Sequence, residues 1–225
     1  MNKVESLTKL TSSYAGEIIG KIEPYLNFKT YQHGQRFLVS ASQQRLFVIR
    51  KGITTLNRQS DDLLLGFYLA PSIRGVLIPY ATDISEYLLK VIDSAEIAIV
   101  EYELFTSLLS DFALWETYLK HLQLALSVSL EQVLKLTLPN AYDVIRLQLI
   151  ELMSEPDIVR KSVTAEQYIR SKTRISRSRI MNILRRLRSL GHINTERGVL
   201  IEIGFIPETD EIFSPGHHGV PLVSP

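Results

Sequence analysis

Eight basic side chains stand close together between Arg170 and Leu190, and no acidic residue interrupts them. The other 204 residues hold 17 basic and 24 acidic residues, a net charge of −7. A cationic segment on an otherwise acidic chain predicts a local surface that binds a polyanion. The eight basic residues are Arg170, Lys172, Arg174, Arg177, Arg179, Arg185, Arg186 and Arg188.

The apolar residues of this segment repeat with the period of a helix that runs from Ser176 to Leu190. Ser176 is a suitable N-cap, and Gly191 is placed to end the helix in the left-handed conformation. The face that must pack inward is apolar, and the opposite face is polar and cationic. The inward face comprises Ile180, Ile183, Leu184, Leu187 and Leu190, and the outward face Ser178, Asn182, Arg185 and Ser189, flanked by Arg179 and Arg186.

The surrounding elements match a helix-turn-helix followed by a hairpin. A short helix is expected at 164–171, and residues 192–205 are expected to form two strands around a turn at Glu196–Gly198. In this arrangement the second helix enters the major groove, where Arg reads guanine and Asn reads adenine, and the hairpin acts as a wing. The predicted DNA-binding residues are Lys172, Thr173, Arg174, Ser176, Arg177, Ser178, Arg179, Asn182, Arg185, Arg186 and Arg197.

Two other interpretations of the basic helix are a solvated surface helix and an amphipathic helix on a membrane surface. The order helix, turn, helix, hairpin favours DNA, because a free amphipathic segment does not need these neighbours. A third alternative is a protein-interaction module whose basic helix docks on an acidic partner.

A long helix is expected from Asp111 to Leu136, because this stretch has no Gly or Pro and ends before Pro139. Its apolar residues alternate in steps of three and four, which is typical of a coiled coil. It could instead pack on its own domain, but a helix between two domains rarely has enough neighbours to cover it. The predicted dimer interface comprises Phe112, Trp115, Leu119, Leu122, Leu126, Ser129 and Val133.

Short apolar runs separated by turn residues fill the region from Tyr25 to Glu103 and predict an antiparallel β-roll or barrel after an N-terminal helix. The fold class is therefore α+β. The predicted domains are residues 1–110 for the helix and β-roll, 111–138 for the long dimerisation helix, 139–206 for the winged helix-turn-helix and 207–225 for an extended or mobile tail.

Several function classes have no support in the sequence. The chain has no cysteine, which excludes disulfides and thiolate chemistry, and His33, His121, His192, His217 and His218 have no metal-ligand spacing. Because nucleophile and phosphate-loop motifs are also missing, no enzyme, cofactor or metal is expected. With no secretory signal or apolar run of membrane-spanning length, a soluble cytoplasmic protein is expected.

From about Tyr31 to Ile203, the sequence resembles the cAMP receptor protein/FNR family (CRP/FNR) of bacterial transcription regulators. The segment "ISRSRIMNILRRL" (175–187) resembles the family's recognition helix at Ser176, Arg177, Ile180, Leu184, Arg185 and Leu187, and "RLFVIRKG" (45–52) resembles a strand-to-turn segment of its β-roll. Asn182 and Ser178 depart from the family pattern, so a different half-site sequence is expected. More loosely, the chain resembles the enterobacterial subgroup that is linked to peroxide resistance.

In members that bind cAMP, a Glu contacts the ribose and an Arg with a Ser or Thr contacts the phosphate. An ungapped alignment of 73–105 places these positions at Gly75, Ser85 and Glu86. The required carboxylate and guanidinium are both missing, and Glu86 would face the phosphate with a like charge. Arg74 is nearby but lacks the small partner. Cyclic nucleotides are therefore not expected to bind in the family's manner.

The resemblance implies a homodimeric transcription regulator that binds double-stranded DNA and is not controlled by cAMP. One alternative is a ligand-gated regulator of the same architecture that senses an unidentified small-molecule effector. Direct thiol sensing of peroxide is not available, because the chain has no cysteine.

Overall fold

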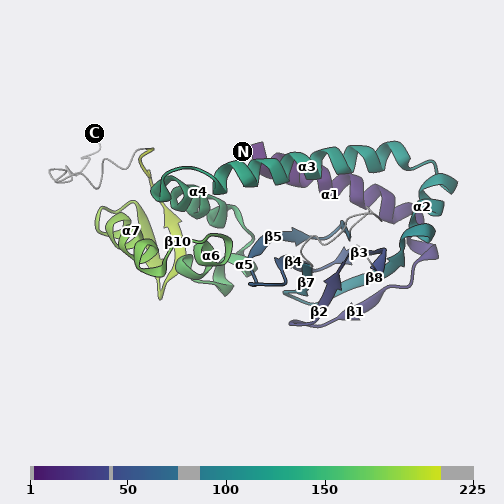
Figure 1. The fold of residues 1–225 in the computed structure, drawn as a ribbon, viewed down its shortest axis with the longest axis horizontal. Helices are drawn as coiled ribbons and strands as arrows, with labels where there is room; N and C mark the ends of the chain where they lie inside the picture. The colour runs from purple at the N-terminus through teal and green to yellow at the C-terminus, as the bar shows by residue number, and fades with distance from the viewer. Residues whose placement is uncertain (1–2, 41–42, 76–86, 209–225) are drawn as a thin grey trace. The chain divides into compact units, whose positions relative to one another are not determined.

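The computed structural model describes residues 3–40, 43–75 and 87–208, with side chains from residue 13 onward. The chain divides into two compact units, Met1–Glu131 and Gln132–Pro225, and each is considered by itself. Figure 1 shows the helices and strands of both units.

The first unit is an antiparallel β-roll of two four-stranded sheets accompanied by helices. One sheet has the strand order β1-β8-β3-β6 and the other β2-β7-β4-β5. The elements are α1 (Lys3–Ile22), the 3-10 helix η1 (Glu23–Tyr25), β1 (Lys29–Tyr31), β2 (Arg36–Val39), β3 (Arg45–Lys51), β4 (Ile53–Arg58), β5 (Leu64–Leu69), β6 (Ser72–Gly75), β7 (Tyr87–Val91), β8 (Ala95–Glu101), α2 (Tyr102–Asp111) and α3 (Trp115–Leu136), whose last residues, from Gln132, belong to the second unit.

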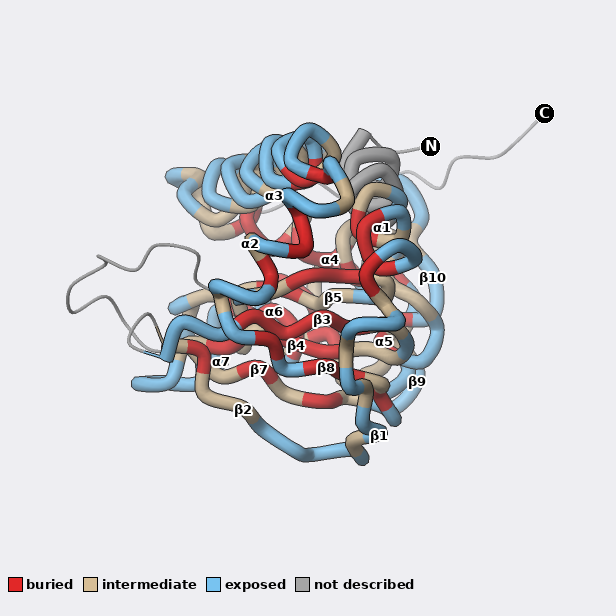
Figure 2. The backbone as a smooth tube through the Cα atoms, turned by 90° about the vertical axis from the view of Figure 1, so that its right-hand side faces the viewer, coloured by how far each residue is buried: buried red, intermediate tan, exposed pale blue. Residues whose placement is uncertain are grey.

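The interior of the roll is an apolar cluster between the two sheets. Side chains alternate along each strand, so one face of β3 and β8 points into this cluster. Figure 2 shows that buried segments concentrate in the strands, whereas most of α3 is exposed. The buried members are Val39, Phe47, Ile49, Leu89, Val91, Ala95 and Ile97.

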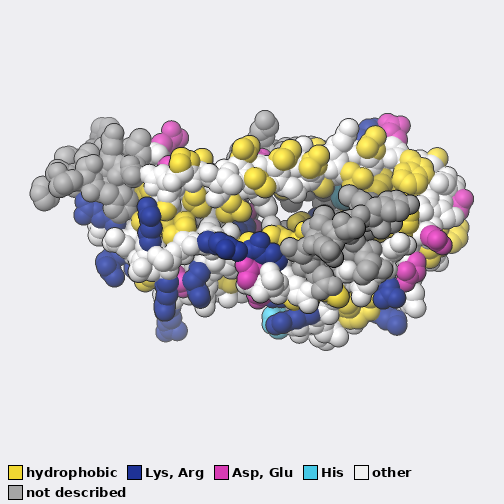
Figure 3. All heavy atoms as spheres, in the orientation of Figure 1, with side chains coloured by type: hydrophobic (Ala, Val, Ile, Leu, Met, Phe, Trp, Pro, Cys, Tyr) yellow, Lys and Arg dark blue, Asp and Glu magenta, His cyan; other side chains and the backbone are white. Residues whose placement is uncertain are grey.

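The long helix begins later than the sequence indicates. Helix α2 ends at Asp111 and α3 starts at Trp115, so Phe112 lies in the connection. Ala113 between them has φ 53°, and the amide of Leu114 donates to the carbonyl of Leu109. A left-handed residue ends a helix, and because it is Ala rather than Gly the sequence carries no sign of the break. Figure 3 shows apolar side chains at the surface along α3.

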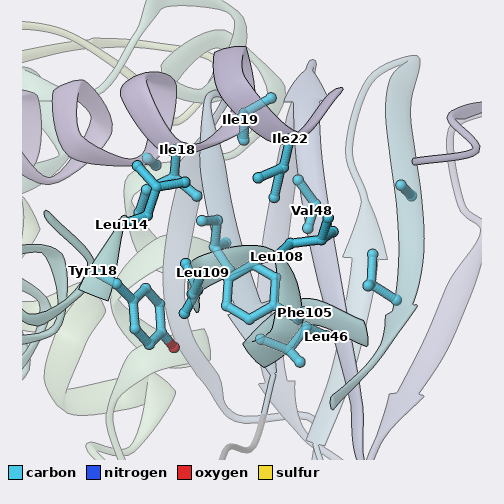
Figure 4. Close-up of a cluster of buried hydrophobic side chains, with 14 residues drawn as sticks. Ile18, Ile19, Ile22, Leu46, Val48, Phe105, Leu108, Leu109, Leu114 and Tyr118 are labelled. Carbon is cyan, nitrogen blue, oxygen red and sulfur yellow. The ribbon is translucent and has the colours of Figure 1, made fainter. Parts of the chain in front are cut away.

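A second apolar cluster lies on the other face of the β1-β8-β3-β6 sheet, against the helices. Residues of β3 such as Leu46 and Val48 alternate with those of the roll interior, and Ile18 and Ile22 of α1 are fully buried against them. Figure 4 shows these side chains together with Phe105, Leu109 and Tyr118 from α2 and α3. This cluster fixes the start of α3 on the roll.

Most strands lie where the sequence predicts them, with three differences. Strands β1 and β6 are short and have no apolar run of their own, and β6 follows Pro71 and ends at Gly75. The sequence also predicts a strand at the apolar run "GVLIPY" (75–80), of which all but Gly75 lies outside the described residues. The expected antiparallel roll is confirmed.

The second unit is a helix-turn-helix with a C-terminal hairpin. Its helices pack around an apolar core to which α4, α6 and α7 contribute, and β9 pairs antiparallel with β10. Helix α5 is not predicted by the sequence, because its six residues are too few to show a helical period. The elements are α4 (Ala141–Ser154), α5 (Asp157–Ser162), α6 (Ala165–Lys172), α7 (Arg177–Ser189), β9 (Ile193–Glu196) and β10 (Val199–Ile203).

Candidate nucleic-acid interface

Helix α7 is capped at both ends by the residues that the sequence indicates. The Ser176 hydroxyl accepts a hydrogen bond from the Arg179 amide at 3.4 Å. At the other end Gly191 has φ 74°, and the amide of His192 donates to the carbonyl of Leu187 at 2.9 Å. The two caps satisfy backbone groups that a helix otherwise leaves open and fix where α7 begins and ends.

The two faces of α7 are segregated as predicted. Ile180 and Leu187 are fully buried, and Ile183 and Leu184 are 6% and 5% exposed. The opposite face is open to solvent and contains no carboxylate. Its exposed residues are Arg177, Ser178, Arg179, Asn182, Arg185, Arg188 and Ser189, while Arg186 is half-buried. The side chains that could read a DNA groove therefore lie on one exposed surface, and Figure 3 shows Lys and Arg gathered on this unit.

The hairpin of β9 and β10 is held against the start of α6. The carbonyl of Gly198 accepts a hydrogen bond from the Ala165 amide at 2.8 Å. Thr164 is the N-cap of α6 in a capping box with Gln167. Arg197, at φ 49° and exposed, lies at the turn between the strands, which is the place expected for a contact with the DNA backbone.

Lys172 does not lie on the exposed surface, contrary to the prediction. Its side chain is 4% exposed, and its Nζ donates to Glu151 at 2.6 Å and to the Tyr168 hydroxyl at 2.8 Å. The Tyr168 hydroxyl donates to Glu155 at 3.2 Å. A buried charge needs a partner of opposite sign, so Lys172 links α6 to α4 and is not available to a phosphate.

The remaining predicted DNA-binding residues precede α7. Thr173 caps the end of α6, where its hydroxyl donates to the Ile169 carbonyl at 2.8 Å, and Arg174 is exposed in the turn. Arg177 is 3.8 Å from the Glu166 carboxylate, which also pairs with Arg170 at 2.8 Å. Because the Arg177 side chain is 74% exposed, this ion pair is weak and can give way to a phosphate or a base.

Five apolar residues of the predicted dimer interface lie in an exposed stripe on α3. Leu119, Leu126 and Val133 are 56%, 60% and 54% exposed. Trp115 and Leu122 share this exposure, Ser129 is exposed with its hydroxyl bonded to the Ala125 carbonyl, and Phe112 is partly buried on the second cluster. The stripe also includes Leu130 and Leu134, which a strict seven-residue repeat passes over because a straight helix has 3.6 residues per turn.

Of the three degenerate nucleotide positions, only Gly75 can be described. It has φ 150°, and a Cβ atom there would lie 2.6 Å from the carbonyl oxygen of Arg45. A Glu therefore cannot occupy this position without displacing the backbone of β3. Ser85 and Glu86 lie outside the described residues.

The described residues show neither a membrane-spanning helix nor a metal-binding cluster. No helix there is long and apolar enough to cross a membrane. No group of three or more His, Asp or Glu in the same ranges is placed to hold a metal ion.

Residues 141–208 match the family model described as winged helix-turn-helix DNA binding. The "Inhibitor of hydrogen peroxide resistance" of Salmonella typhimurium is 29% identical over 170 residues, 74% of this chain and 80% of that protein. The protein of the same name from Escherichia coli K12 is 25% identical over 171 residues, 76% of this chain and 82% of that protein.

Solved structures show the same architecture. The c-di-GMP-responsive global regulator CLP of Xanthomonas campestris superposes with a TM-score of 0.65 at 18% identity over 84% of this chain and 99% of that chain. A transcriptional regulator of the CRP/FNR family from Eubacterium rectale gives 0.61 at 13% identity over 84% and 90%. The chain therefore has the CRP/FNR fold that its sequence resembles, with a winged helix-turn-helix DNA-binding domain at residues 141–208.

Proposed function

We propose that this protein is a sequence-specific transcription regulator that binds double-stranded DNA as a homodimer. The observation that carries the proposal is the exposed face of α7, where Asn182, Ser178 and four arginines stand without an acidic residue on a helix of a winged helix-turn-helix domain. In that fold the second helix lies in the major groove, and backbone contacts set its register.

The proposed roles divide by position along α7. Arg177 and Asn182 lie toward the N-terminal half and read base edges. Arg188, near the C-terminal end, contacts phosphates, as does Arg197 in the wing. Reading residues discriminate between sequences, whereas phosphate contacts raise the affinity for all of them.

The homodimer is supported by the apolar stripe on α3. Seven large apolar side chains of this helix are each at least 39% exposed: Trp115, Leu119, Leu122, Leu126, Leu130, Val133 and Leu134. Monomeric proteins rarely leave so continuous an apolar surface in water. Pairing two copies of α3 buries it and presents two copies of α7 to a near-palindromic site.

The proposed regulator does not respond to cAMP. The carboxylate that would bind the ribose is replaced by Gly75, where the backbone leaves no room for a side chain. We expect millimolar cAMP to leave the melting temperature of the protein unchanged. A clear rise in melting temperature would refute this part of the proposal.

The DNA-binding role is tested with oligonucleotides selected from a random pool by the full-length protein. Affinity for the selected site should fall at least about tenfold between roughly 50 and 200 mM salt, because phosphate contacts release counterions. Asn182→Ala should lose about 1–3 kcal/mol of preference for the selected site over random DNA. Arg188→Ala should weaken binding to both DNAs to the same extent.

Arg36→Ala is the matched control, because it removes an exposed arginine from β2 in the other unit. It should leave both affinities unchanged. If Asn182→Ala lowered the affinity for selected and random DNA equally, α7 would not read the base sequence. An affinity that does not change with salt concentration would contradict DNA binding altogether.

We further infer that the regulated genes affect resistance to hydrogen peroxide, as the name of the relatives from Salmonella typhimurium and Escherichia coli suggests. Because the chain has no cysteine, it does not sense peroxide through a thiol. Deleting the gene should change survival in peroxide, and complementation with wild-type protein but not with Asn182→Ala should restore it. Unchanged survival would exclude this role while leaving DNA binding intact.

A further inference from the structure

Glu166 is a carboxylate on α6 that none of the proposed DNA contacts uses. It lies in the first turn of α6, which packs against α7, and its side chain is only 11% exposed. Its Oε1 is buried and accepts no hydrogen bond from the described residues. A buried carboxylate costs free energy unless nearby cations offset its charge. The stability of the charged form of Glu166 therefore depends on the cations around it.

Two arginines of the exposed basic surface lie beside this carboxylate. The Nε of Arg170, one turn later on α6, is 2.8 Å from Oε1 of Glu166, and the Nε of Arg177, the first residue of α7, is 3.8 Å from the same atom. Both arginine side chains are more than half exposed. Because two guanidiniums surround one carboxylate, the local charge stays positive and the surface still attracts a polyanion.

The backbone is fixed on both sides of the pair formed by Glu166 and Arg177. Ala165, immediately before Glu166, donates its amide to the Gly198 carbonyl at 2.8 Å. Ser176, immediately before Arg177, is the N-cap of α7. When the backbones that carry two interacting side chains are held in place, the side chains meet in a restricted range of orientations. The Glu166 carboxylate can therefore limit how the Arg177 side chain points, although most of that side chain is in solvent.

The contact with Arg177 is made through Nε, and this matters for reading DNA. Arginine recognises guanine with two N–H donors directed at O6 and N7, whereas contacts to phosphate carry no sequence information. An arginine that is held at Nε keeps both terminal nitrogens for a base. The carboxylate also disfavours a phosphate at the same place, because like charges repel each other. The pair therefore favours base contact over backbone contact.

A purely structural role is the alternative for Glu166. An acidic residue in the first turn of a helix interacts favourably with the helix dipole. An exposed carboxylate would serve that purpose as well, so the dipole does not explain why Glu166 lies beside Arg177. The two roles also predict different results, because a loss of stability alone lowers the affinity for every DNA sequence equally.

We propose that Glu166 is a positioning residue for DNA recognition, which holds Arg177 so that its terminal nitrogens meet a guanine in the major groove. This inference rests on the proposed role of Arg177 in reading bases. Glu166 itself contacts no DNA. Its contribution is to restrict Arg177 before binding, so that less conformational freedom is lost when the base is read.

The proposal is tested with Glu166→Gln in the full-length protein, by gel shift on the selected site and on random DNA at one salt concentration. The preference for the selected site should fall at least about threefold, because a well-oriented arginine supplies much of the discrimination at one base pair. The affinity for random DNA should stay the same or rise, since a negative charge is removed. Glu202→Gln, which removes a carboxylate from exposed β10, should leave the preference unchanged.

A double-mutant cycle with Arg177→Ala shows whether Glu166 acts through Arg177. Replacing each G·C pair of the selected site in turn should reveal the same insensitive position in Glu166→Gln and in Arg177→Ala. The double variant should show the preference of Arg177→Ala alone, because Glu166 then has no reading side chain to hold. Melting temperatures of all variants measure any change in stability separately.

Additive losses of preference in the double variant, or equal losses of affinity for both DNAs in Glu166→Gln, would overturn the positioning role while leaving DNA binding intact. If Arg177→Ala kept the full preference of the wild type, the reading role of Arg177 would be wrong and this inference would fall with it. If Glu166→Gln did not fold, Glu166→Asp would replace it with the same expected pattern, because it keeps the charge in the first turn of α6 but has a shorter reach.

Discussion

Arginine serves three different purposes in this chain, and the surroundings of each residue decide which. Arg50 bridges Glu23 and Glu96 at the surface of the roll. Arg177 has only a distant carboxylate and stays largely exposed. The Arg74 guanidinium stacks on the Tyr68 ring and forms no ion pair with a carboxylate of the described residues. The surroundings therefore decide whether an arginine forms ion pairs within the fold, stays exposed to solvent or stacks on an aromatic ring.

Among single residues, Glu155 should make stability depend on pH. Burial and then the nearby charge of Glu151 raise its pKa above the ordinary value of 4.5, although Lys172 and the Tyr168 hydroxyl oppose the shift. A raised folded-state pKa means that the native state holds the proton more tightly than the unfolded state. Its contribution to stability is thus present below pH 4.5 and is lost as the pH rises through the folded-state pKa.

The substitution Glu155→Gln should therefore raise the melting temperature at pH 7 by a few degrees and leave it nearly unchanged at pH 4. The amide oxygen of Gln can still accept from Tyr168. Thermal unfolding across pH 4–8 measures the difference, with Glu202→Gln on exposed β10 as the control for the loss of one charge. A lower melting temperature at pH 7 would mean that Glu155 chiefly stabilises Lys172.

At the scale of the element, helix α3 should control assembly. Leu126→Glu should dissociate the proposed dimer, because each copy loses roughly 1.5–3 kcal/mol of apolar burial. Two copies together raise the dissociation constant at least about 100-fold. Sedimentation velocity measures this, and the loss should extend to affinity for a two-half-site operator. Gln123→Glu, an exposed position on the same helix, should remain dimeric; a wild-type monomer at high micromolar concentration would disprove the dimer.

The elements that the sequence predicts are those whose signals are local. The buried face of α7, its caps at Ser176 and Gly191, and the hairpin after it all follow from residue types and spacing. Strand β6 could not be predicted, because its residues have no apolar pattern of their own and its position depends on backbone pairing with β3, more than 20 residues earlier in the chain. The break before α3 is hidden because Ala113 adopts the left-handed conformation.

In the candidate DNA-binding site, too, features with local signals are predicted and features that depend on distant residues are not. The exposed residues of α7 follow from its periodicity, but the burial of Lys172 depends on Glu151, 21 residues earlier on α4. A count of basic residues cannot distinguish a lysine that faces solvent from one that neutralises a buried carboxylate. Arg74 was noted only as a neighbour of the cassette, because its contact with Tyr68 on another sheet is invisible to sequence spacing.

At the scale of the whole molecule, positive charge is concentrated in 21 residues while the rest of the chain carries −7. A dimer with this distribution should require a near-palindromic operator with half-sites about one helical turn, or roughly 10 bp, apart. Inserting about 5 bp between the half-sites turns one of them to the opposite side of the duplex. Affinity should then fall at least tenfold, whereas replacing the same central bases without changing the spacing should have a smaller effect, as gel shifts would measure.

The hydrogen bond between Gly198 and Ala165 limits how this domain can be re-engineered. A Cβ atom on Gly198 would lie 3.0 Å from Cγ2 of Thr164, so the turn and the first residues of α6 fit each other closely. A chimera that grafts a foreign hairpin onto this chain would have to carry the matching residue at 164 with it. The turn of the hairpin and the start of α6 should therefore be exchanged together when this domain is re-engineered.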